Sequence, residues 1–354
     1  MRGSHLSDAV AHVLQQLTDL AELSAYQQEH ETTIVLFANR FSGALSDSRR
    51  LRLLSNALAE LPSPMASRRR GARSLVVAPA ERDEIAGELL RLGGILKEEL
   101  RHLTRRVLLL SIGGDGTHKS VLSLLVGLPK EQRQRVVVFR FPAGSSNDGP
   151  ISRRPGEAAM HLLEGRTPRS LKALEIETAL GHRELGFNIA SVGIDAYTSI
   201  KNEQFRSLFG GNSYRGLANL AVLFYNAFHD PGRIKLEIET DQGEAVTTDE
   251  RIILLALGVS GSRTYGGGIP VLPGESNLCL VEHLGLVGKV LLKGRLLAGT
   301  HGEHPKVHLY KAFRLSISGE RKVPIQIDGE ARWLLPEEWP LTMHLGREHI
   351  NELY

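Results

Sequence analysis

Residues 107–117 read Val107-Leu108-Leu109-Leu110-Ser111-Ile112-Gly113-Gly114-Asp115-Gly116-Thr117, an apolar run that ends in three glycines around one carboxylate. A helical pattern follows. In an open α/β sheet, ligands bind just beyond the carboxyl ends of the strands. Glycines there let backbone N–H groups approach a phosphate, and the next helix offers its positive N-terminus. Asp115 would repel a bare phosphate, so it favours a magnesium ion or a hydroxyl about to be phosphorylated. The stretch therefore predicts a nucleotide site for phosphoryl transfer; a simple Gly-Asp-Gly turn is the alternative.

The residues around this stretch alternate between short apolar runs and helical patterns. Continuous apolar runs suit parallel strands buried on both faces, so the alternation predicts a doubly wound parallel sheet in an α/β fold. The expected strands are Thr33–Ala38, Ser74–Ala78, Val107–Ile112 and Val136–Phe141, and the expected helices are Ser46–Glu60, Glu81–Leu92 and His118–Gly127. We expect an exposed loop over Leu61–Gly71. This gives an N-terminal helical extension over 1–31 and a nucleotide-binding α/β domain over 32–165.

Strand patterns dominate after residue 166. Apolar and charged residues alternate over 234–239, and Asp241-Gln242-Gly243 then turns the chain. Further strands are expected at Leu171–Thr178, Leu185–Ser191, Arg251–Ser260, Leu278–Glu282, Ala312–Ser318 and Val323–Asp328, with helical insertions at Tyr214–Phe228 and about Leu286–Leu297. The pattern predicts an antiparallel β-sandwich domain over 166–354, which would bind the phosphate acceptor.

Composition is that of an ordinary globular protein. At 354 residues the chain is longer than a single hydrophobic core usually supports, so two domains are expected. Of its residues, 42% are hydrophobic and 23% charged. Because Cys279 is the only cysteine of the sequence, the chain cannot form an internal disulfide, which suits a reducing cytoplasm. No apolar stretch reaches the roughly 18–20 residues that span a bilayer. The expected location is therefore the cytoplasm.

Basic residues are clustered although the net charge is only +3 and the pI is 9.0. The clusters are Arg49, Arg50 and Arg52; Arg68, Arg69, Arg70 and Arg73; and Arg101, Arg105 and Arg106. They would attract an anionic membrane at about 1 kcal/mol per residue near its surface. Solvated helix faces and loops explain most of them equally well. A nucleic-acid partner is not expected, because aromatic residues make up only 5% and no basic-aromatic motif appears.

The stretch Gly113–Thr117 resembles the signature shared by diacylglycerol kinases, sphingosine kinases, NAD kinases and, more loosely, phosphofructokinases. Four later segments resemble motifs of the diacylglycerol kinase catalytic domain. They are Pro142–Asp148, Asn188–Ala196, Tyr265–Gly268 followed by Ile269-Pro270, and Gln326–Glu330. Each motif is short, but the order and spacing of all five resemble the bacterial lipid kinase branch from about residue 32 to the end.

This resemblance implies ATP and Mg²⁺ as cofactors and a nucleotide site built by the loops that follow three strands. The residues it assigns to that site are Asn39, Arg40, Ser42, Gly43, Gly113, Gly114, Asp115, Gly116, Thr117, Gly144, Ser145 and Asn147. Arg40 stands where the family usually has proline and adds a charge that could meet a phosphate. Asp115 would contact the magnesium ion that the bound nucleotide carries.

Asp328 and Glu330 flank Gly329 at an expected hairpin tip. Asp-Gly alone is a common structural hairpin signal. The resemblance instead implies a general base here, and we favour Asp328, with Glu330 orienting it or exchanging roles. The implied reaction is in-line transfer from Mg²⁺-ATP to a lipid hydroxyl. The implied partners are the lipid substrate and, peripherally, the anionic inner face of a membrane; a homodimer is left open.

Some segments depart from the family pattern. Glu275-Ser276-Asn277 replaces an Asp-Gly that helps to hold a structural magnesium, so that accessory site is expected to be lost. A metal cluster of His301, His304 and His308 is not favoured, because Pro305 breaks a helix that would align the ligands. The helix over 286–297 either touches a bilayer or packs its leucines in the core beside snorkelling cations; we favour packing.

Three functions stay open at this point. The first is an ATP-dependent lipid kinase, and the second is an NAD kinase-like enzyme, for which no convincing Asn-Glu pair toward a nicotinamide ribose is found. The third is a catalytically degenerate regulator that binds a nucleotide or a lipid.

Overall fold

A computed structural model describes residues 2–30, 32–61, 73–144, 147–150, 152–209, 225, 231–265 and 268–353. The chain divides into two compact units, each described below by itself. Unit 1 comprises Met1–Leu171 and Glu348–Tyr354, and unit 2 comprises Lys172–Arg347. We expected one division near residue 166; the units divide after Leu171, and the last residues return to unit 1. The N-terminal helices belong to unit 1.

Unit 1 contains a parallel sheet in the order β2-β1-β3-β4. Its strands are β1 (Thr33–Ala38), β2 (Ser74–Val77), β3 (Val107–Gly113) and β4 (Val136–Pro142). β1 pairs in parallel with β2 and β3, and β3 pairs in parallel with β4. All four expected strands are confirmed. The strand order reverses between β1 and β3, which is where an open α/β sheet binds ligands.

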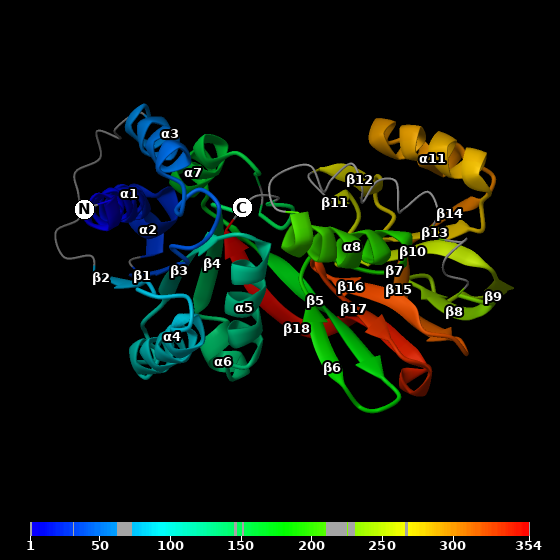
Figure 1. Cartoon of the computed structure of the whole chain (residues 1–354). Coiled ribbons are helices and arrows are strands. Elements are labelled where there is room, and N and C mark those ends of the chain that lie inside the picture. The colour runs from blue at the N-terminus through cyan, green and yellow to red at the C-terminus, as the bar shows by residue number, and fades with distance from the viewer. Residues whose placement is uncertain are drawn as a thin grey trace. The chain divides into compact units, whose positions relative to one another are not determined.

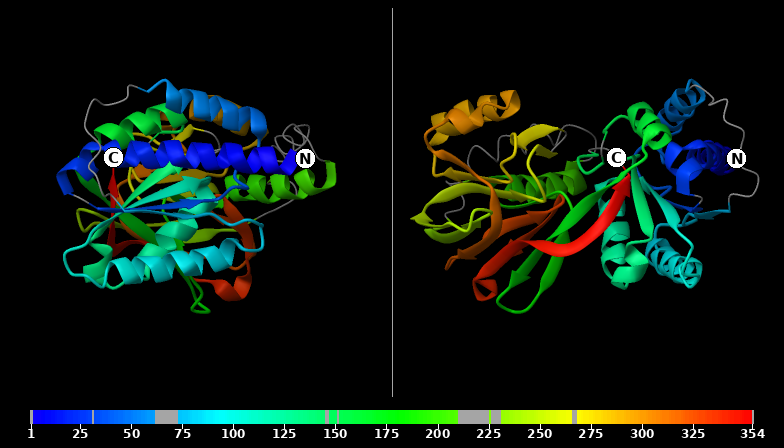
Figure 2. Two further views of the ribbon diagram at one scale, coloured as in Figure 1. Left: turned by 90° about the vertical axis from the view of Figure 1, so that its left-hand side faces the viewer. Right: turned by 180° about the vertical axis from the view of Figure 1, so that it is seen from behind.

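Helices cover both faces of this sheet (Figure 1, and the left view of Figure 2). One face carries α1 (Arg2–Leu23), α2 (Ala25–His30), α3 (Ser48–Ala59) and α7 (Pro155–Glu164). The other carries α4 (Ile85–Glu99), α5 (Asp115–Val126) and the short α6 (Lys130–Arg133). Sequence sets the boundaries locally: α3 starts after Asp47, whose carboxylate accepts the N–H groups of Arg49 and Arg50.

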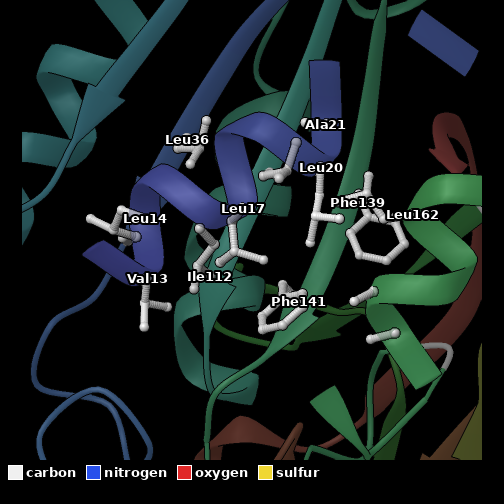
Figure 3. Close-up of a cluster of buried hydrophobic side chains, with 14 of the residues drawn as sticks. Val13, Leu14, Leu17, Leu20, Ala21, Leu36, Ile112, Phe139, Phe141 and Leu162 are labelled. Atoms are coloured by element: carbon white, nitrogen blue, oxygen red, sulfur yellow. The ribbon is translucent and has the colours of Figure 1, made fainter. Parts of the chain in front are cut away.

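The N-terminal helix α1 is a central part of the core rather than an appendage. Its apolar residues recur every three or four positions, and Val13, Leu17 and Ala21 are fully buried. Figure 3 shows them beside Leu36 of β1 and Phe139 of β4. A fully buried leucine contributes about 1.5–3 kcal/mol, so α1 stabilises this face of the sheet substantially.

Unit 2 is built from antiparallel strands, as expected. A six-stranded sheet has the order β14-β13-β10-β7-β16-β17. Its strands are β7 (Ile189–Gly193), β10 (Ile252–Gly258), β13 (Leu278–Glu282), β14 (Val307–Tyr310), β16 (Val323–Ile327) and β17 (Glu330–Leu334). In a second group, β18 (Leu341–Leu353) pairs with β15 (Ala312–Ser318), β15 pairs with β8 (Ile234–Thr240), and β8 pairs with β9 (Ala245–Glu250). β18 also pairs with β5 (Pro168–Thr178), which pairs with β6 (Arg183–Gly186). A short hairpin joins β11 (Arg263–Tyr265) and β12 (Ile269–Leu272).

Two helices accompany these strands. α8 (Ile194–Phe209) packs against β7, β16 and β17, and α11 (Leu286–Ala298) packs against β12 (Figure 1). α11 ends at Gly299, which adopts φ 73°. The helix expected over Tyr214–Phe228 lies outside the described residues apart from Tyr225, which is helical and buried, and 62–71 of the expected loop also lie outside them.

Two strand assignments in unit 2 differ from those expected from the sequence. The run Leu185–Ser191 is two strands, β6 and β7, because Phe187 and Asn188 turn the chain between them. β18 was missed altogether. It is 13 residues long, but its apolar alternation breaks at Gly346-Arg347-Glu348-His349. The first part of β18 pairs antiparallel with β15, whereas Asn351 and Glu352 pair in parallel with β4.

Candidate functional site

Three loops of unit 1 meet at the carboxyl ends of β1, β3 and β4. Asn39 donates its backbone N–H to Ile112 at 3.0 Å, Ala143 donates to Gly113 at 2.7 Å, and Ala44 donates to Ala143 at 2.7 Å. These bonds join the loops in the order of their strands. The structure therefore brings together, at the sheet edge predicted from the sequence, the described residues that we assigned to a nucleotide site.

Glycines allow these loops to touch. A Cβ added to Gly144 would lie 2.4 Å from Cα of Gly114, and one added to Gly43 would lie 3.1 Å from the carbonyl carbon of Gly144. A Cβ on Gly113 would lie 2.6 Å from Cβ of Thr117. A side chain at Gly43 or Gly144 would clash with the backbone of a neighbouring loop, and one at Gly113 would clash with the Thr117 side chain. Gly116 differs, because nothing lies within 4 Å of its added Cβ.

Asn39 links the first loop to the second. Its Nδ2 donates to Oγ1 of Thr117 at 3.0 Å, and its Oδ1 accepts the N–H of Phe41 at 3.0 Å. The Ser42 hydroxyl donates back to the Asn39 carbonyl at 2.7 Å. Asn39 and Ser42 thus shape the turn, while the O–H of Thr117 retains its hydrogen for a further acceptor. Arg40 is half-buried and has no hydrogen-bond partner among the described residues.

The N-terminus of α5 carries spare donors. Its N-cap is Gly114, which has no side chain to cap the helix. The first turn of a helix leaves its N–H groups without intrahelical partners. Among the described residues, none accepts from the N–H groups of Gly116 or Thr117. Together with the helix dipole, these donors make an anion site.

Asp115 is the first residue of α5 and is half-buried. Its Oδ1 accepts the N–H of Gly149 at 3.0 Å, and its Oδ2 accepts that of Asp148 at 3.3 Å. Asp115 therefore anchors the loop after β4 as well as standing at the candidate site. Each oxygen keeps further lone-pair capacity, so a contact with a cation or a hydroxyl remains chemically open.

Asn147 closes the loop after β4. It adopts φ 54°, accepts the Gly144 N–H at 2.8 Å and donates to the Gly144 carbonyl at 3.2 Å. Asparagine tolerates this left-handed conformation better than most residues. Asn147 is buried, so its contribution to the site is to shape the loop. Ser145 lies outside the described residues.

A buried polar layer lies beneath these loops, and sequence reasoning missed it. Nδ1 of His118 and the hydroxyl of Ser111 form a hydrogen bond of 2.9 Å. Burial, and then the charge of Arg140, lowers the pKa of His118 to about 3. Arg140 forms a buried ion pair with Glu352 on β18 and lies against Gly149. The available signal was Arg140 itself, a charge inside an otherwise apolar strand.

In unit 2, Asp328 is placed in the predicted hairpin between β16 and β17 and adopts φ 53°. Its Oδ2 accepts the N–H of Phe187 at 2.6 Å, and its Oδ1 accepts those of Asn188 at 2.8 Å and Ile189 at 3.1 Å. These donors stabilise the ionised carboxylate. Asp328 therefore holds the turn that separates β6 from β7. Glu330 is exposed at the start of β17.

Asp195 was quoted within a motif but was not assigned to the site. It lies in the first turn of α8, and its Oδ2 accepts hydrogen bonds from the Ser191 hydroxyl and, at 3.4 Å, from Gln326 Nε2. Burial raises the pKa of Asp195, although those bonds and the nearby backbone N–H groups oppose the shift. Its Oδ1 is buried and makes no hydrogen bond to the described residues. Such a group in a folded protein points to a functional role.

The segment expected to have lost a metal site has a structural task. The side chain of Asn277 is buried, and it accepts the N–H of Ala312 at 2.7 Å and donates to its carbonyl at 2.8 Å. Within the described ranges, no group of three or more His, Cys, Asp or Glu residues could hold a metal ion. His301 is buried and lies 3.0 Å from the Val271 carbonyl, while His308 pairs with Glu282 at 2.8 Å.

Comparison with known proteins finds the fold but no sequence relative. No family model and no curated protein matches the chain. Three solved structures from Bacillus anthracis strain Sterne are similar, one named a diacylglycerol kinase and two named as candidate diacylglycerol kinases. They are 14–17% identical, with TM-scores of 0.53–0.56, and the match covers 91% of this chain and 96–97% of theirs. This chain has their fold. The expected fold class, an α/β unit followed by an antiparallel β unit, is therefore confirmed.

No helix among the described residues is both long and apolar enough to cross a membrane.

Proposed function

We propose that this protein is an ATP-dependent lipid kinase that transfers the γ-phosphoryl group to a lipid hydroxyl. The observation that carries the proposal is the junction of three loops around Gly144, Gly114 and Gly43, with an uncapped helix N-terminus beside a carboxylate. Supporting it are the five sequence motifs and the shared fold with proteins named diacylglycerol kinases.

The chain's own groups would act on the phosphates by position and charge. The N–H groups of Gly116 and Thr117 and the Thr117 hydroxyl would donate to phosphate oxygens, and Arg40 would add a positive charge. Preorganised donors of this kind supply most of the stabilisation in phosphoryl transfer. Magnesium would neutralise phosphate charge. Asp115 fits it as a hard oxygen ligand, but since the described residues offer no cluster of ligands, the ion would arrive with the nucleotide.

Unit 2 would supply the acceptor side. We propose Asp328 as the group that takes the hydroxyl proton. Three backbone N–H groups hold its carboxylate in a fixed position at the hairpin between β16 and β17. Asp195 is a second candidate to contact the acceptor, because its buried Oδ1 has no hydrogen bond among the described residues. A positioned carboxylate base contributes typically about 10²–10⁴-fold.

The test is transfer from labelled ATP, with magnesium, to a total lipid extract or to NAD. Labelled lipid supports the proposal, whereas labelled NADP would identify an NAD kinase-like enzyme instead. Nucleotide binding without transfer to either acceptor would identify a regulator.

We also propose that the protein meets its lipid peripherally, at an anionic membrane surface. Binding that is equal on neutral and anionic vesicles at all salt concentrations would contradict this part.

A further inference from the structure

The helix α11 turns its apolar side chains outward. Of the twelve large apolar side chains exposed among the described residues, five lie on this one helix. They are Leu286 (50% exposed), Val287 (72%), Val290 (53%), Leu291 (62%) and Leu297 (61%). The sequence favoured packing of these leucines in the core, and that expectation was wrong. Figure 1 and the right view of Figure 2 show α11 at the edge of unit 2, with no described element of that unit on its outer side.

The inward side of α11 shows why the apolar face is outside. Leu292 and Lys289 are the buried residues of the helix. Leu292 joins a cluster with Val271 and Leu284, and burial lowers the pKa of Lys289. Leu292 and the half-buried Leu296, which packs against the same cluster, attach the helix to its unit. The remaining apolar surface is therefore not used by the described part of the fold.

The exposed residues form one continuous stripe with a positive charge on each side. At about 100° per residue, Leu286, Leu297, Val290, Val287 and Leu291 follow one another over an arc of roughly 140°. Lys293 projects just before this arc and Arg295 just after it, and both are exposed. The sequence of α11, Leu-Val-Gly-Lys-Val-Leu-Leu-Lys-Gly-Arg-Leu-Leu-Ala, contains no acidic residue.

This arrangement matches one occupant. A helix that lies in a membrane surface buries an apolar stripe among the acyl chains and keeps cations at its margins, beside the headgroups. A second copy fits less well, because a two-fold contact through this stripe would bring the cations of two copies together with no acid on either helix. We propose that α11 is the segment that binds an anionic lipid bilayer, with Val287, Val290 and Leu291 inserted and Lys293 and Arg295 at the headgroups.

This inference rests on the membrane contact proposed above and names its surface. The test uses the full chain with vesicles of phosphatidylcholine, or of phosphatidylcholine mixed with phosphatidylglycerol, and measures cosedimentation. Leu291→Glu should weaken binding to the mixed vesicles at least about tenfold, since each methylene group withdrawn from the membrane lowers affinity several-fold. Leu90→Glu is the matched control, because Leu90 is a 77% exposed leucine on a helix of unit 1. This variant should bind the vesicles like the unaltered protein.

Two further variants make the result specific. Leu291→Ser removes apolar surface without adding a charge and should also weaken binding. Lys293→Gln combined with Arg295→Gln should weaken binding to the mixed vesicles and leave binding to phosphatidylcholine unchanged. Melting temperatures should stay near that of the unaltered protein, because all these side chains are exposed.

The outcomes distinguish the proposed role of α11 from the proposed membrane contact of the protein. Equal binding by Leu291→Glu, Leu291→Ser and the unaltered protein would overturn the role of α11 while the membrane contact stands. No binding by the unaltered protein would overturn both. A dimer in solution that Leu291→Glu dissociates, with vesicle binding unchanged, would assign the stripe to self-association instead. Transfer from ATP to detergent-dispersed lipid tests the kinase proposal separately, since α11 takes no part in it.

Discussion

Each unit uses an aspartate that directly precedes a glycine to hold a neighbouring loop: Asp115 at the first residue of α5, and Asp328 in the hairpin between β16 and β17. Asp115 in unit 1 accepts two backbone N–H groups, from Asp148 and Gly149. Asp328 in unit 2 accepts three, from residues 187–189, and itself adopts a left-handed conformation. The same Asp-Gly pair therefore serves as an anchor in both units.

The difference lies in the groups around each carboxylate. Asp115 stands at a helix N-terminus beside N–H groups and a hydroxyl that have capacity for a ligand. The backbone donors around Asp328 are used on Asp328 itself. We therefore expect loss of Asp115 to affect turnover more than stability, and loss of Asp328 to affect both.

Replacement of Asp115 should have the largest effect. Asp115→Asn should lower turnover by about 10²–10⁴-fold, because it removes a charge at the reacting centre. The amide oxygen can still accept the Gly149 N–H, and only the longer bond from Asp148, 3.3 Å, is lost, so the melting temperature should fall less than for Asp328→Asn. Nucleotide affinity, measured by titration, should fall much less than turnover. Near-normal turnover of this variant on the true acceptor would show that the proposed site is wrong.

Replacement of Asp328 should separate the two regions. Asp328→Asn places an N–H₂ group against backbone donors and should cost about 1–3 kcal/mol in the free energy of unfolding. Turnover should also fall, with little change in nucleotide affinity, since nucleotide and acceptor sites are assigned to different units. Glu320→Gln is the control for charge alone, because Glu320 is an exposed carboxylate of unit 2. If Asp328→Asn keeps full stability, the three hydrogen bonds do not hold the turn.

A pair of glycines tests whether loop contact shapes the nucleotide site. Gly144→Ala should separate the loops after β3 and β4, since its Cβ would meet Gly114 at 2.4 Å. Overpacking of this kind typically costs about 1–3 kcal/mol, and nucleotide affinity should fall with it. Gly116→Ala has open space and should have little effect on stability. Equal nucleotide affinities for the two variants would contradict the proposed geometry.

The two regions also differ in how far the sequence predicts them. The parallel strands of unit 1 were predicted almost to the residue, because β1, β3 and β4 are largely apolar runs, each followed by a loop that contains glycine. Their parallel pairing then places Asn39, Gly114 and Gly144 at one edge. Unit 2 was harder, since its pairings join distant residues: Asp328 fixes a turn at 187–189 that no local pattern reveals.

The buried partners were not predictable for a related reason. Arg140 and Glu352 form their ion pair because β18 pairs with β4 across more than two hundred residues of sequence, and the charge of Arg140 in turn acts on His118. The outward face of α11 was also misjudged, because an amphipathic pattern identifies an apolar stripe but not whether protein covers it. Periodicity specifies faces, whereas tertiary pairing decides their partners.

The buried histidine of unit 1 predicts an acid-dependent loss of stability. The pKa of His118 is about 3 in the folded protein against an ordinary value of 6.5, so the unfolded chain binds more protons between these values. Stability should therefore fall as pH drops below about 6.5, by up to about 1.4 kcal/mol per pH unit from this group. His118→Asn should start less stable at neutral pH, because its side chain is smaller, but lose less on acidification. Denaturant unfolding at about pH 7 and about pH 5 measures how much stability each protein loses. Equal losses for both proteins would contradict a neutral buried imidazole.

The buried carboxyl of unit 2 predicts an effect of the opposite sign. Burial raises the pKa of Asp195 above its usual 3.8, so the folded state binds the extra proton. The stability it contributes is complete below the unfolded pKa and is lost as pH rises through the folded pKa. Ser191, Gln326 and nearby backbone N–H groups stabilise the carboxylate and oppose the shift, but burial is the larger cause. Asp195→Asn keeps the shape without the charge, so its stability relative to the unaltered protein should increase with pH and then level off. Thermal unfolding of both proteins across that range measures the difference. A difference that is constant with pH would mean that Asp195 titrates alike in both states, and its buried oxygen would then be no candidate for the acceptor.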